Sequence, residues 1–360
     1  MNEVGKGPLS GVRVVEFTGI GPGPHCAMLL SDLGAEILRI EKEGGNGWPN
    51  AIADRGRATA TVDIRTDAGR AFCLEVCARA DVVIEGFRPG VMERLGLGPE
   101  VLLGCNPRLV YGRVTGWGQD GPLAQAAGHD INYIALAGAL DPIGEKGGRS
   151  IPPLNLVGDF GGGSMLLAFG IVAALFERGR SGLGQVVDAA IVDGVSSLMS
   201  FFDGLRKDGQ VSLDRSENVL AGAAPFYRTY HCRDGREVAI GSLETKFYRS
   251  LLELIGAPVD FLSAQYDAST WPERGEMLAA IFVQRDLADW VALLEGTDAC
   301  FAPVLKLGEV ADHPHMKARS AYVSKNGRAQ CAPVPRFSRT PGEIQDAKGA
   351  EELLEKWRAS

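Results

Sequence analysis

Short apolar runs and stretches of helical periodicity alternate along the first half of the chain. Apolar, β-branched runs occupy residues 12–17, 36–40, 80–85 and 109–114, and helical patterns occupy residues 25–33 and 70–78. Strands that alternate with helices are typical of parallel βαβ units. The pattern therefore predicts a doubly wound α/β sheet in this half of the chain.

Helical periodicity continues through residues 155–206 and breaks at Gly182-Leu183-Gly184. The longest apolar run of the chain, residues 165–176, lies inside this region and is interrupted only by Gly170. A membrane-spanning helix needs roughly 20 apolar residues, so this run is too short to span a bilayer. We predict that it forms a buried helix.

A second α+β unit is expected after the small, polar residues 213–224. Residues 226–232 and 237–240 alternate like two strands joined by the turn Arg233-Asp234-Gly235, and helical patterns follow at residues 247–255, 271–282 and 286–294. The tail from residue 313 is rich in proline and charge and ends in a helical pattern at residues 351–358. We expect a large domain over residues 1–212, a small α+β domain over 213–312, and a C-terminal segment, 313–360, that returns to the large domain.

Composition and charge narrow the class of protein. The chain has 360 residues, of which 45% are apolar and 23% charged, with a net charge of −8 and a pI near 5.3. These values are ordinary for a soluble enzyme and argue against a nucleic-acid-binding surface. The seven cysteines are odd in number, scattered and without a CxxC pair, which indicates neither a disulfide framework nor a zinc site. Residues 1–9 lack an apolar signal core. We therefore expect a cytoplasmic protein that is not bound to a membrane.

The turn Gly19-Ile20-Gly21-Pro22-Gly23-Pro24 follows the first predicted strand and opens a helix, with Glu41 at the end of the next strand. This arrangement imitates the dinucleotide-binding fingerprint. Pro24, however, replaces the third glycine, so its ring removes an N–H group and fills the space where helix and strand should touch. We therefore predict a tight βα turn that is a poor site for NAD. A different nucleotide next to the turn stays an open alternative.

Two glycine-flanked stretches each place an acid/base group at the predicted start of an apolar helix. Gly128-His129-Asp130-Ile131-Asn132-Tyr133 contains His129, and Asn155-Leu156-Val157-Gly158-Asp159-Phe160-Gly161-Gly162-Gly163 contains Asp159. Taken alone, the histidine fits a buried, hydrogen-bonded residue and the aspartate fits a helix cap. Taken together, two acid/base groups on opposite sides of one carbon suffice for proton-transfer isomerisation without a metal or redox cofactor. Histidine has a pKa near 6.5, whereas Asp159 would need a raised pKa to exchange protons at neutral pH.

Segments spread along nearly the whole chain resemble the family III CoA-transferases, also called the CaiB/BaiF superfamily. The segments are residues 7–16, 32–36, 85–90, 115–122, 184–189 and 335–340. The stretch around His129 is similar to the α-methylacyl-CoA racemase branch of this family. The transferases place a carboxylate nucleophile at the position of Asp159 and lack an equivalent of His129. The resemblance implies a Rossmann-like large domain, a smaller α+β domain and a homodimer of interlocked chains, with each active site between the large domain of one chain and the small domain of the other.

The same resemblance implies three catalytic residues acting on an acyl-CoA thioester. His129 would handle the proton of the S epimer and Asp159 that of the R epimer. Removal of the proton leaves an enolate, and our own hypothesis is that backbone amides at the starts of the two glycine-flanked helices face its oxygen. Glu244, on the small domain, would pair with His129 and orient its imidazole. Taken alone, Glu244 simply favours the start of a helix. CoA is part of the substrate, and no separate cofactor is implied.

CoA carries phosphates, so an acidic enzyme needs local cations to bind it. Arg88 follows the strand that ends at Glu85, where doubly wound folds bind ligands, and a guanidinium can grip phosphate with two hydrogen bonds. Arg57 and Lys42 are weaker candidates. Solvated surface charge is the alternative explanation for all three cations, and for Lys42 it is about as good as phosphate binding. The remaining predicted binding residues are Ile20, Asp130, Tyr133, Asn155 and Tyr227, of which Asn155 would also hydrogen-bond Asp159.

Three functions are weighed from the sequence. The leading one is a racemase of 2-methylacyl-CoA thioesters, with a branched fatty acyl, bile-acid-like or aromatic propionyl group, in fatty acid and lipid metabolism. The alternative is a CoA-transferase in which Asp159 forms an acyl anhydride and then a CoA thioester. A non-catalytic nucleotide-binding protein that uses the turn at residues 19–24 is the third, and it leaves His129, Asp159 and Glu244 unexplained.

Overall fold

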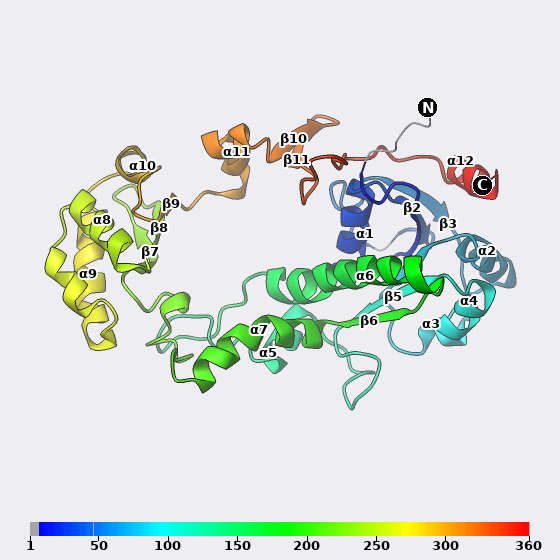
Figure 1. The fold of residues 1–360 in the computed structure, drawn as a ribbon, viewed down its shortest axis with the longest axis horizontal. Helices are drawn as coiled ribbons and strands as arrows, with labels where there is room; N and C mark the ends of the chain where they lie inside the picture. The colour runs from blue at the N-terminus through cyan, green and yellow to red at the C-terminus, as the bar shows by residue number, and fades with distance from the viewer. Residues whose placement is uncertain (1–6, 46, 360) are drawn as a thin grey trace. The chain divides into compact units, whose positions relative to one another are not determined.

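The computed structural model describes residues 7–45 and 47–359 of the chain (Figure 1). The chain divides into two compact units. The first comprises Met1–Ala137, Pro153–Leu198 and Lys317–Ser360, and the second comprises Gly138–Pro152 and Met199–Met316. The domain boundaries expected from the sequence, after residues 212 and 312, stay predictions.

The first unit is built on a six-stranded sheet in which every neighbouring pair of strands is parallel. Its strand order is β3-β2-β1-β4-β5-β6, which is the order of doubly wound dinucleotide-binding folds. The strands are β1 Arg13–Phe17, β2 Glu36–Glu41, β3 Arg57–Thr61, β4 Val82–Glu85, β5 Val110–Thr115 and β6 Val186–Ala190. The α/β sheet expected from the apolar runs is thus confirmed.

Two of the six strands, β3 and β6, are absent from the sequence prediction. The β3 segment is Arg-Ala-Thr-Ala-Thr. Its two Thr residues favour a strand, but it is short and contains no Val, Ile or aromatic residue, so it does not form an apolar run. The β6 segment runs without a turn into helix α7, Ile191–Lys207, so the helical pattern of that region hides it. Both are edge strands of the sheet.

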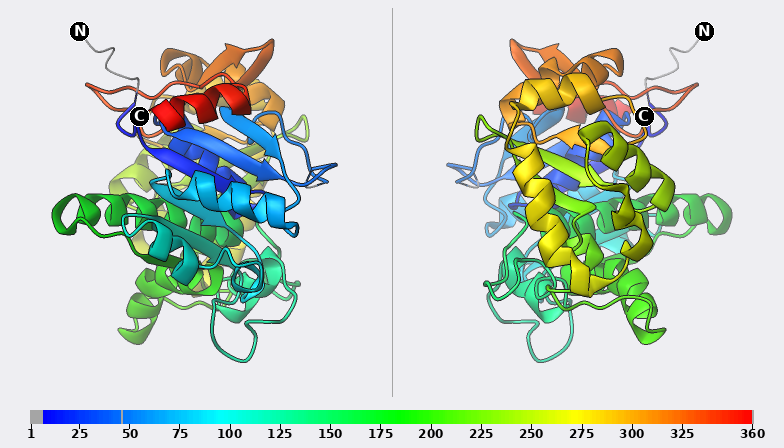
Figure 2. Two further views of the ribbon diagram at one scale, coloured as in Figure 1. Left: turned by 90° about the vertical axis from the view of Figure 1, so that its right-hand side faces the viewer. Right: turned by 90° about the vertical axis from the view of Figure 1, so that its left-hand side faces the viewer.

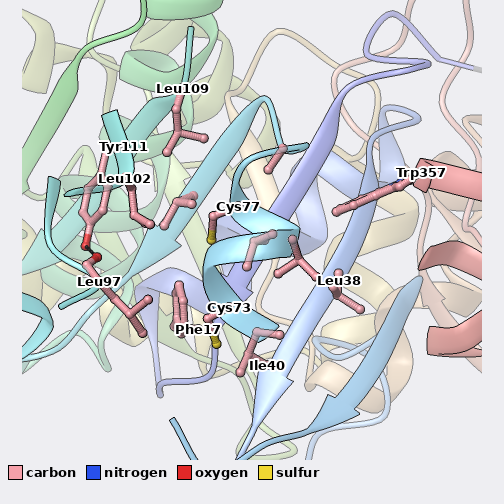
Figure 3. Packing of buried hydrophobic residues seen from close by; sticks show 14 of the residues in the cluster. Phe17, Leu38, Ile40, Cys73, Cys77, Leu97, Leu102, Leu109, Tyr111 and Trp357 are labelled. Atoms are coloured by element: carbon pink, nitrogen blue, oxygen red, sulfur yellow. Dashed lines mark hydrogen bonds between the residues drawn. The ribbon is translucent and has the colours of Figure 1, made fainter. Parts of the chain in front are cut away.

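Helices of the first unit cover the two faces of the sheet. They are α1 Pro22–Asp32, α2 Asp67–Cys77, α3 Val91–Arg94, α4 Pro99–Cys105, α5 Asp130–Leu136, the π-helix η1 Leu156–Met165, α6 Leu166–Ser181 and α12 Ala350–Ala359. On one face, Phe17, Leu38, Cys73 and Tyr111 pack in a cluster that Trp357 of α12 joins (Figure 3). Trp357 is only 1% exposed, and Figure 2 shows α12 beside β2 and β3. The C-terminal helix therefore completes the core of the first unit.

Helix α6 corrects the prediction of a buried helix for the apolar run at residues 165–176. Its buried face consists of Leu167, Ile171 and Ala174, but Phe169 is 74% exposed and Phe176 is 71% exposed. The prediction is therefore wrong for one face, because a helix that is apolar all round turns only part of its surface to the sheet. Within the described residues, Leu156–Ser181 is the one helical stretch whose length and composition alone would allow it to cross a membrane.

The second unit has a three-stranded antiparallel sheet with the order β7-β8-β9. The strands are β7 Tyr227–His231, β8 Glu237–Gly241 and β9 Phe301–Pro303, and the longer helices are α8 Thr245–Ile255, α9 Trp271–Phe282 and α10 Leu287–Leu294. Phe226, Phe282 and Trp290 are among the buried residues of its core. The first two strands and all three helices are confirmed; β9, at three residues, is too short to give a pattern.

The tail belongs to the first unit from Lys317 onward. It contains a short helix, α11 Pro314–Ala318, and a hairpin of β10 Tyr322–Lys325 with β11 Arg328–Cys331 before α12. Arg55 fixes the hairpin from inside the first unit: its Nη1 donates to Gln330 Oε1 at 3.0 Å and its Nε donates to Asp32 Oδ1 at 2.9 Å. The short 3-10 helices are η2 Val219–Ala221, η3 Val259–Ala264, η4 Ala268–Thr270 and η5 Leu307–Asp312.

Candidate active site

A cavity of about 1650 Å³ opens at the carboxyl ends of the strands of the first unit. Its lining includes the residue that directly follows each of four strands: Thr18 after β1, Lys42 after β2, Gly86 after β4 and Gly116 after β5. Doubly wound folds bind ligands outside the carboxyl ends of their strands. The cavity exceeds the roughly 300–1,000 Å³ of most small-molecule pockets, so it has room for a long ligand.

The cavity brings together seven of the residues singled out from the sequence, which are Ile20, Lys42, Arg88, His129, Tyr133, Asn155 and Asp159. Four others do not line it. Arg57 and Asp130 are buried in the first unit, and Tyr227 and Glu244 belong to the second unit.

His129 occupies the N-cap position of α5, with an extended backbone conformation. Its N–H group donates to Oδ1 of Asn132, one turn later, at 3.0 Å. This contact satisfies a backbone donor at the helix start and fixes the direction of the chain there. The His129 side chain is exposed and lines the cavity. The local sequence thus presents an imidazole to the cavity from a rigid helix start.

Asp159 lies in the π-helix η1, four residues after its N-cap, Asn155. Nδ2 of Asn155 donates to Oδ2 of Asp159 at 3.1 Å, as the sequence suggested. Burial is the main reason that the pKa of Asp159 is raised; the charge of Asp130 adds to the rise, while the Asn155 hydrogen bond and the charge of His129 oppose it. The raised pKa brings proton exchange closer to neutral pH.

Asp130 links the two glycine-flanked stretches, because it lies in the first stretch and accepts hydrogen bonds from backbone amides of the second. Its Oδ1 accepts the N–H of Asp159 at 2.7 Å. Burial raises the pKa of Asp130, and hydrogen bonds from the N–H groups of Asp159 and Gly158 to its carboxylate oppose that rise. The side chain is 7% exposed and does not line the cavity. The structure therefore corrects the predicted substrate contact of Asp130: the carboxylate turns inward because it satisfies the first free amides of η1.

Glycines let the backbone of η1 approach its neighbours closely. A Cβ at Gly158 would overlap Oδ1 of Asp130, and a Cβ at Gly194 on α7 would overlap the carbonyl oxygen of Gly162. A Cβ at Gly21, in the turn before α1, would lie 3.2 Å from Oδ2 of Asp159. Asp159 therefore sits against the first βα turn. π-helices are rare and occur frequently at functional sites.

Among the predicted cations, Arg88 and Lys42 line the cavity with exposed side chains. Burial raises the pKa of Tyr133, and the charge of Arg88 opposes that rise, which places Arg88 within electrostatic reach of the tyrosine. Tyr133 itself donates its hydroxyl to the carbonyl oxygen of Gly128 and packs edge-on against Trp117 at 4.8 Å. Arg88 is thus near the stretch that carries His129.

Arg57 has a different environment from the one predicted. Its Nε donates to Oε2 of Glu16 at 2.6 Å, and its other nitrogens donate to the carbonyl oxygens of Ala53, Arg55 and Pro24. Both side chains of the ion pair are essentially inaccessible to solvent. The first residue of β3 points inward to Glu16 on β1, so the structure gives Arg57 an internal ion pair in place of the predicted phosphate contact.

His25 lines the cavity but was not singled out from the sequence. Its Nδ1 lies 2.6 Å from Oγ of Ser164, and its ring lies 4.8 Å from that of Phe160. Burial, followed by the charges of Arg57 and Arg55, lowers its pKa, which favours a neutral imidazole. Its position directly after the Gly-Pro turn at the end of the first strand was the signal that could have indicated it.

Glu244 is the N-cap residue of α8 and is exposed. Tyr227 is the first residue of β7 and is half-buried. The pairing of Glu244 with His129 and the contact of Tyr227 with substrate stay predictions. No group of three His, Cys, Asp or Glu side chains is arranged to hold a metal ion in the part of the chain that the structure describes.

Comparisons with known proteins agree on one family. The pattern that defines CoA-transferase family III matches residues 9–349. An α-methylacyl-CoA racemase from Mus musculus is 44% identical over 334 residues, which cover 92% of this chain and 87% of that protein. A succinyl-CoA–D-citramalate CoA-transferase from Chloroflexus aurantiacus is 30% identical, covering 94% of this chain and 89% of that protein. The crystal structure of a CaiB/BaiF family protein from Brucella suis matches with a TM-score of 0.82 and 26% identity, covering 98% of this chain and 99% of that one.

Proposed function

Because the chain belongs to CoA-transferase family III, we propose that it is an isomerase that interconverts the (2R) and (2S) epimers of 2-methylacyl-CoA thioesters. The observation that carries the proposal is that His129 and Asp159 line one cavity, with the charge of His129 acting on Asp159. The 44% identity with a protein named as a racemase supports it.

The proposed reaction is a 1,1-proton transfer. One basic group removes the proton from the carbon next to the thioester, which leaves an enolate, and the other group, initially protonated, returns a proton to the opposite face. His129 takes the proton of the S epimer and Asp159 takes that of the R epimer, so each turnover leaves the two groups in exchanged protonation states. The raised pKa of Asp159 supports this role, because the group must hold a proton in one direction and release it in the other.

The sequence suggested that backbone amides at the starts of both helices face the enolate oxygen. Asp130 leaves the start of only one helix, α5, for this role. The N–H groups of Gly158 and Asp159 donate to its carboxylate, so these two amides are already occupied. Stabilisation of the enolate by backbone amides is therefore proposed for the start of α5, beside His129. Nothing in this step requires a bound cofactor, because the thioester carbonyl itself accepts the negative charge.

Glu244 is proposed to orient the imidazole of His129 from the second unit of a partner chain in an interlocked homodimer. Phe169 and Phe176 of α6 are large apolar side chains that this chain leaves exposed. Large exposed apolar surface frequently marks a site of contact with another protein, which supports assembly through α6. A His–carboxylate contact would fix the tautomer of the base.

The CoA moiety is proposed to lie along the cavity, with its phosphates at Arg88 and Lys42 and its thioester between His129 and Asp159. The size of the cavity and the two cations at strand ends support this arrangement. Ile20 and Tyr133 would line the path of the pantetheine arm, and Tyr227 of the partner chain in the proposed homodimer would approach it.

The second candidate is CoA transfer between carboxylic acids. The 30% identity with a protein named as a CoA-transferase favours it. The Asp159 carboxylate would then attack the thioester carbonyl and expel the CoA thiolate, which leaves an anhydride between the acyl group and Asp159. The thiolate would attack the Asp159 carbonyl of this anhydride, which releases the donor acid and leaves an aspartyl-CoA thioester. An acceptor carboxylate would take the same two steps in reverse, which forms the new acyl-CoA and frees Asp159. His129 has no task in this route, which is why it ranks second.

One experiment separates the two functions. The protein is incubated with a single epimer of a 2-methylacyl-CoA in deuterium oxide, without an acceptor acid, and the α-hydrogen is followed by NMR. The racemase proposal predicts loss of the α-proton signal together with loss of chirality. Movement of CoA to an added carboxylate, with no exchange, would favour the transferase. Absence of both reactions over a range of acyl lengths would contradict an enzymatic role.

Arg70→Gln is a suitable control for every variant discussed below. Arg70 is an exposed residue of α2 whose ion pair with Asp67 is also exposed, and it does not line the cavity. Exposed pairs of this kind contribute about 0–1 kcal/mol, so its activity should match that of the unmodified protein.

A further inference from the structure

The loop that carries Arg88 connects β4 to the short helix α3. Its residues Gly86, Phe87, Arg88 and Pro89 all line the cavity. Gly90, at the end of the loop, has a φ of 81°, a left-handed conformation that glycine adopts without strain. The side chain of Gln125 donates to the carbonyl oxygen of Pro89 at 3.2 Å. The loop is thus a defined structure whose outward face presents the guanidinium of Arg88.

A set of charged side chains lies behind this loop, and the proposed proton transfer does not use it. Nε of Arg113, on β5, donates to Oε1 of Glu85 at 3.0 Å, and its Nη2 lies 3.0 Å from Oε1 of Glu93. Glu85 is the last residue before the loop, and Glu93 lies in α3, just after it. One guanidinium therefore bridges the two ends of the loop.

Glu85 also contacts the loop directly. Its second carboxylate oxygen, Oε2, accepts the N–H of Phe87, the residue before Arg88, at 2.8 Å. The side chains of Glu85 and Arg113 are 0% and 8% exposed, respectively. Through Oε2 of Glu85 the buried pair holds the backbone of the loop, and through Nη2 of Arg113 it holds the helix that follows the loop.

A gain in folding stability does not explain well why Glu85 and Arg113 form a buried ion pair. A buried ion pair is costly to desolvate, and apolar residues of similar size are frequently as stable or more so. What the pair does supply is direction: the planar guanidinium has donors in a rigid fork, so two carboxylates bound to it are held at a fixed angle. The geometry suits a device that holds the loop in one conformation.

We propose that Arg113, together with Glu85 and Glu93, is a positioning residue that fixes the Arg88 loop for binding a phosphate group of the CoA moiety. The identity of the ligand rests on the proposed function. The chemistry is more general: a phosphate-bearing ligand gains affinity because Arg88 is presented without first having to order its loop.

The test uses Glu93→Gln and Arg113→Lys. Glu93 is 44% exposed, so its substitution removes one arm of the bridge with little disturbance of the core, and the lysine keeps the charge but loses the fork. Affinity for free CoA is measured by calorimetry. The values of kcat and KM are measured with a 2-methylacyl-CoA and with the corresponding pantetheine thioester, which lacks phosphates.

Both variants should weaken CoA binding and raise KM for the CoA thioester, each roughly tenfold. The kcat values and the KM for the pantetheine thioester should change little, because the loop acts on the phosphates. In an Arg88→Ala background, Glu93→Gln should cause no further loss of CoA affinity. Arg70→Gln should behave as the unmodified protein does.

Equal losses for both thioesters would overturn the proposal, because they would show a general structural role. Unchanged CoA affinity in both folded variants, or full additivity with Arg88→Ala, would overturn it as well. Calorimetry requires no turnover, so it tests the role of the loop even if the protein is not a racemase. A protein that binds CoA but exchanges no α-proton would contradict the racemase function alone. A protein that does not bind CoA at all would contradict both.

Discussion

Two regions of the cavity wall are built in different ways. In the acid–base region, His129 and Asp159 are held by contacts of the backbone, where Asp130 accepts the amide of Asp159 and Gly158 leaves no room for a side chain. In the cationic region, Arg88 is carried by a loop whose flanks are held by the side chain of Arg113. The first region is fixed by close packing, and the second is fixed by the directions of the hydrogen bonds in an ion-pair set.

The difference matches what each region is proposed to do. Proton transfer depends steeply on the distance and angle between reacting atoms, and a misplacement of about 1 Å can cost 100-fold in rate. A guanidinium holds a phosphate through hydrogen bonds and takes no part in the chemical step, so an error in its position costs affinity rather than rate. The positional precision that sets the rate is therefore needed in the region where a bond to hydrogen is broken.

Removing either acid/base group should have the largest effect. His129→Ala and Asp159→Ala should each abolish racemisation, with kcat reduced by about 10²–10⁴, while the affinity for CoA is largely retained. NMR exchange in deuterium oxide, started from each epimer, measures the first effect, and calorimetry with CoA measures the second. Full activity in either variant would remove that residue from the mechanism, and loss of CoA affinity would contradict the separate roles of the two regions.

Gly158→Ala should be the next most damaging change. The new Cβ would overlap Oδ1 of Asp130, so the start of η1 and the start of α5 must move apart, and kcat should fall by about 100-fold. Gly104→Ala on α4 is the matched control, since nothing lies within 4 Å of its added Cβ, and it should leave activity unchanged. If both alanine variants were equally active, the acid–base region around His129 and Asp159 would be less rigid than its packing indicates.

The smallest expected effect is a shift of the pH profile in opposite directions. Asp159 must be ionised to take the proton of the R epimer, so kcat/KM for that epimer falls as pH drops through its pKa. The charge of Asp130 raises this pKa and the hydrogen bond from Asn155 lowers it. Asp130→Asn should therefore move the acidic limb to lower pH and Asn155→Ala should move it to higher pH, as measured by the dependence of kcat/KM on pH. Shifts in the same direction would contradict these assignments.

Much of the sheet and half of the site could be predicted from the sequence. The β-branched runs mark four of the six parallel strands, and the two glycine-flanked stretches mark His129 and Asp159. Glu85 and Arg113 could have been found with one further step, because Glu85, the last residue of β4, is the aligned partner of Arg113 on β5. Opposite charges on neighbouring strands of a parallel sheet are an observable signal once the strands are known.

Other features depend on packing that no local pattern encodes. Asp130 follows His129 directly, yet its partners are amides about thirty residues later, so its inward direction is not visible in its own segment. The role of Arg57 is similar, because its partner Glu16 lies two strands away in the sheet. For α6, hydropathy indicates how apolar the helix is but not how much of it the same chain covers.

The position of Trp357 has a consequence for the order in which the protein can fold during synthesis. This side chain completes a cluster that also contains Phe17 and Leu38, so the core of the first unit is not complete until the ribosome has released helix α12. The buried core residues of the second unit lie between Ala224 and Ala299 and are available earlier. Since the early strands must wait with apolar surface uncovered, nascent chains of this protein should depend on chaperones until α12 has emerged.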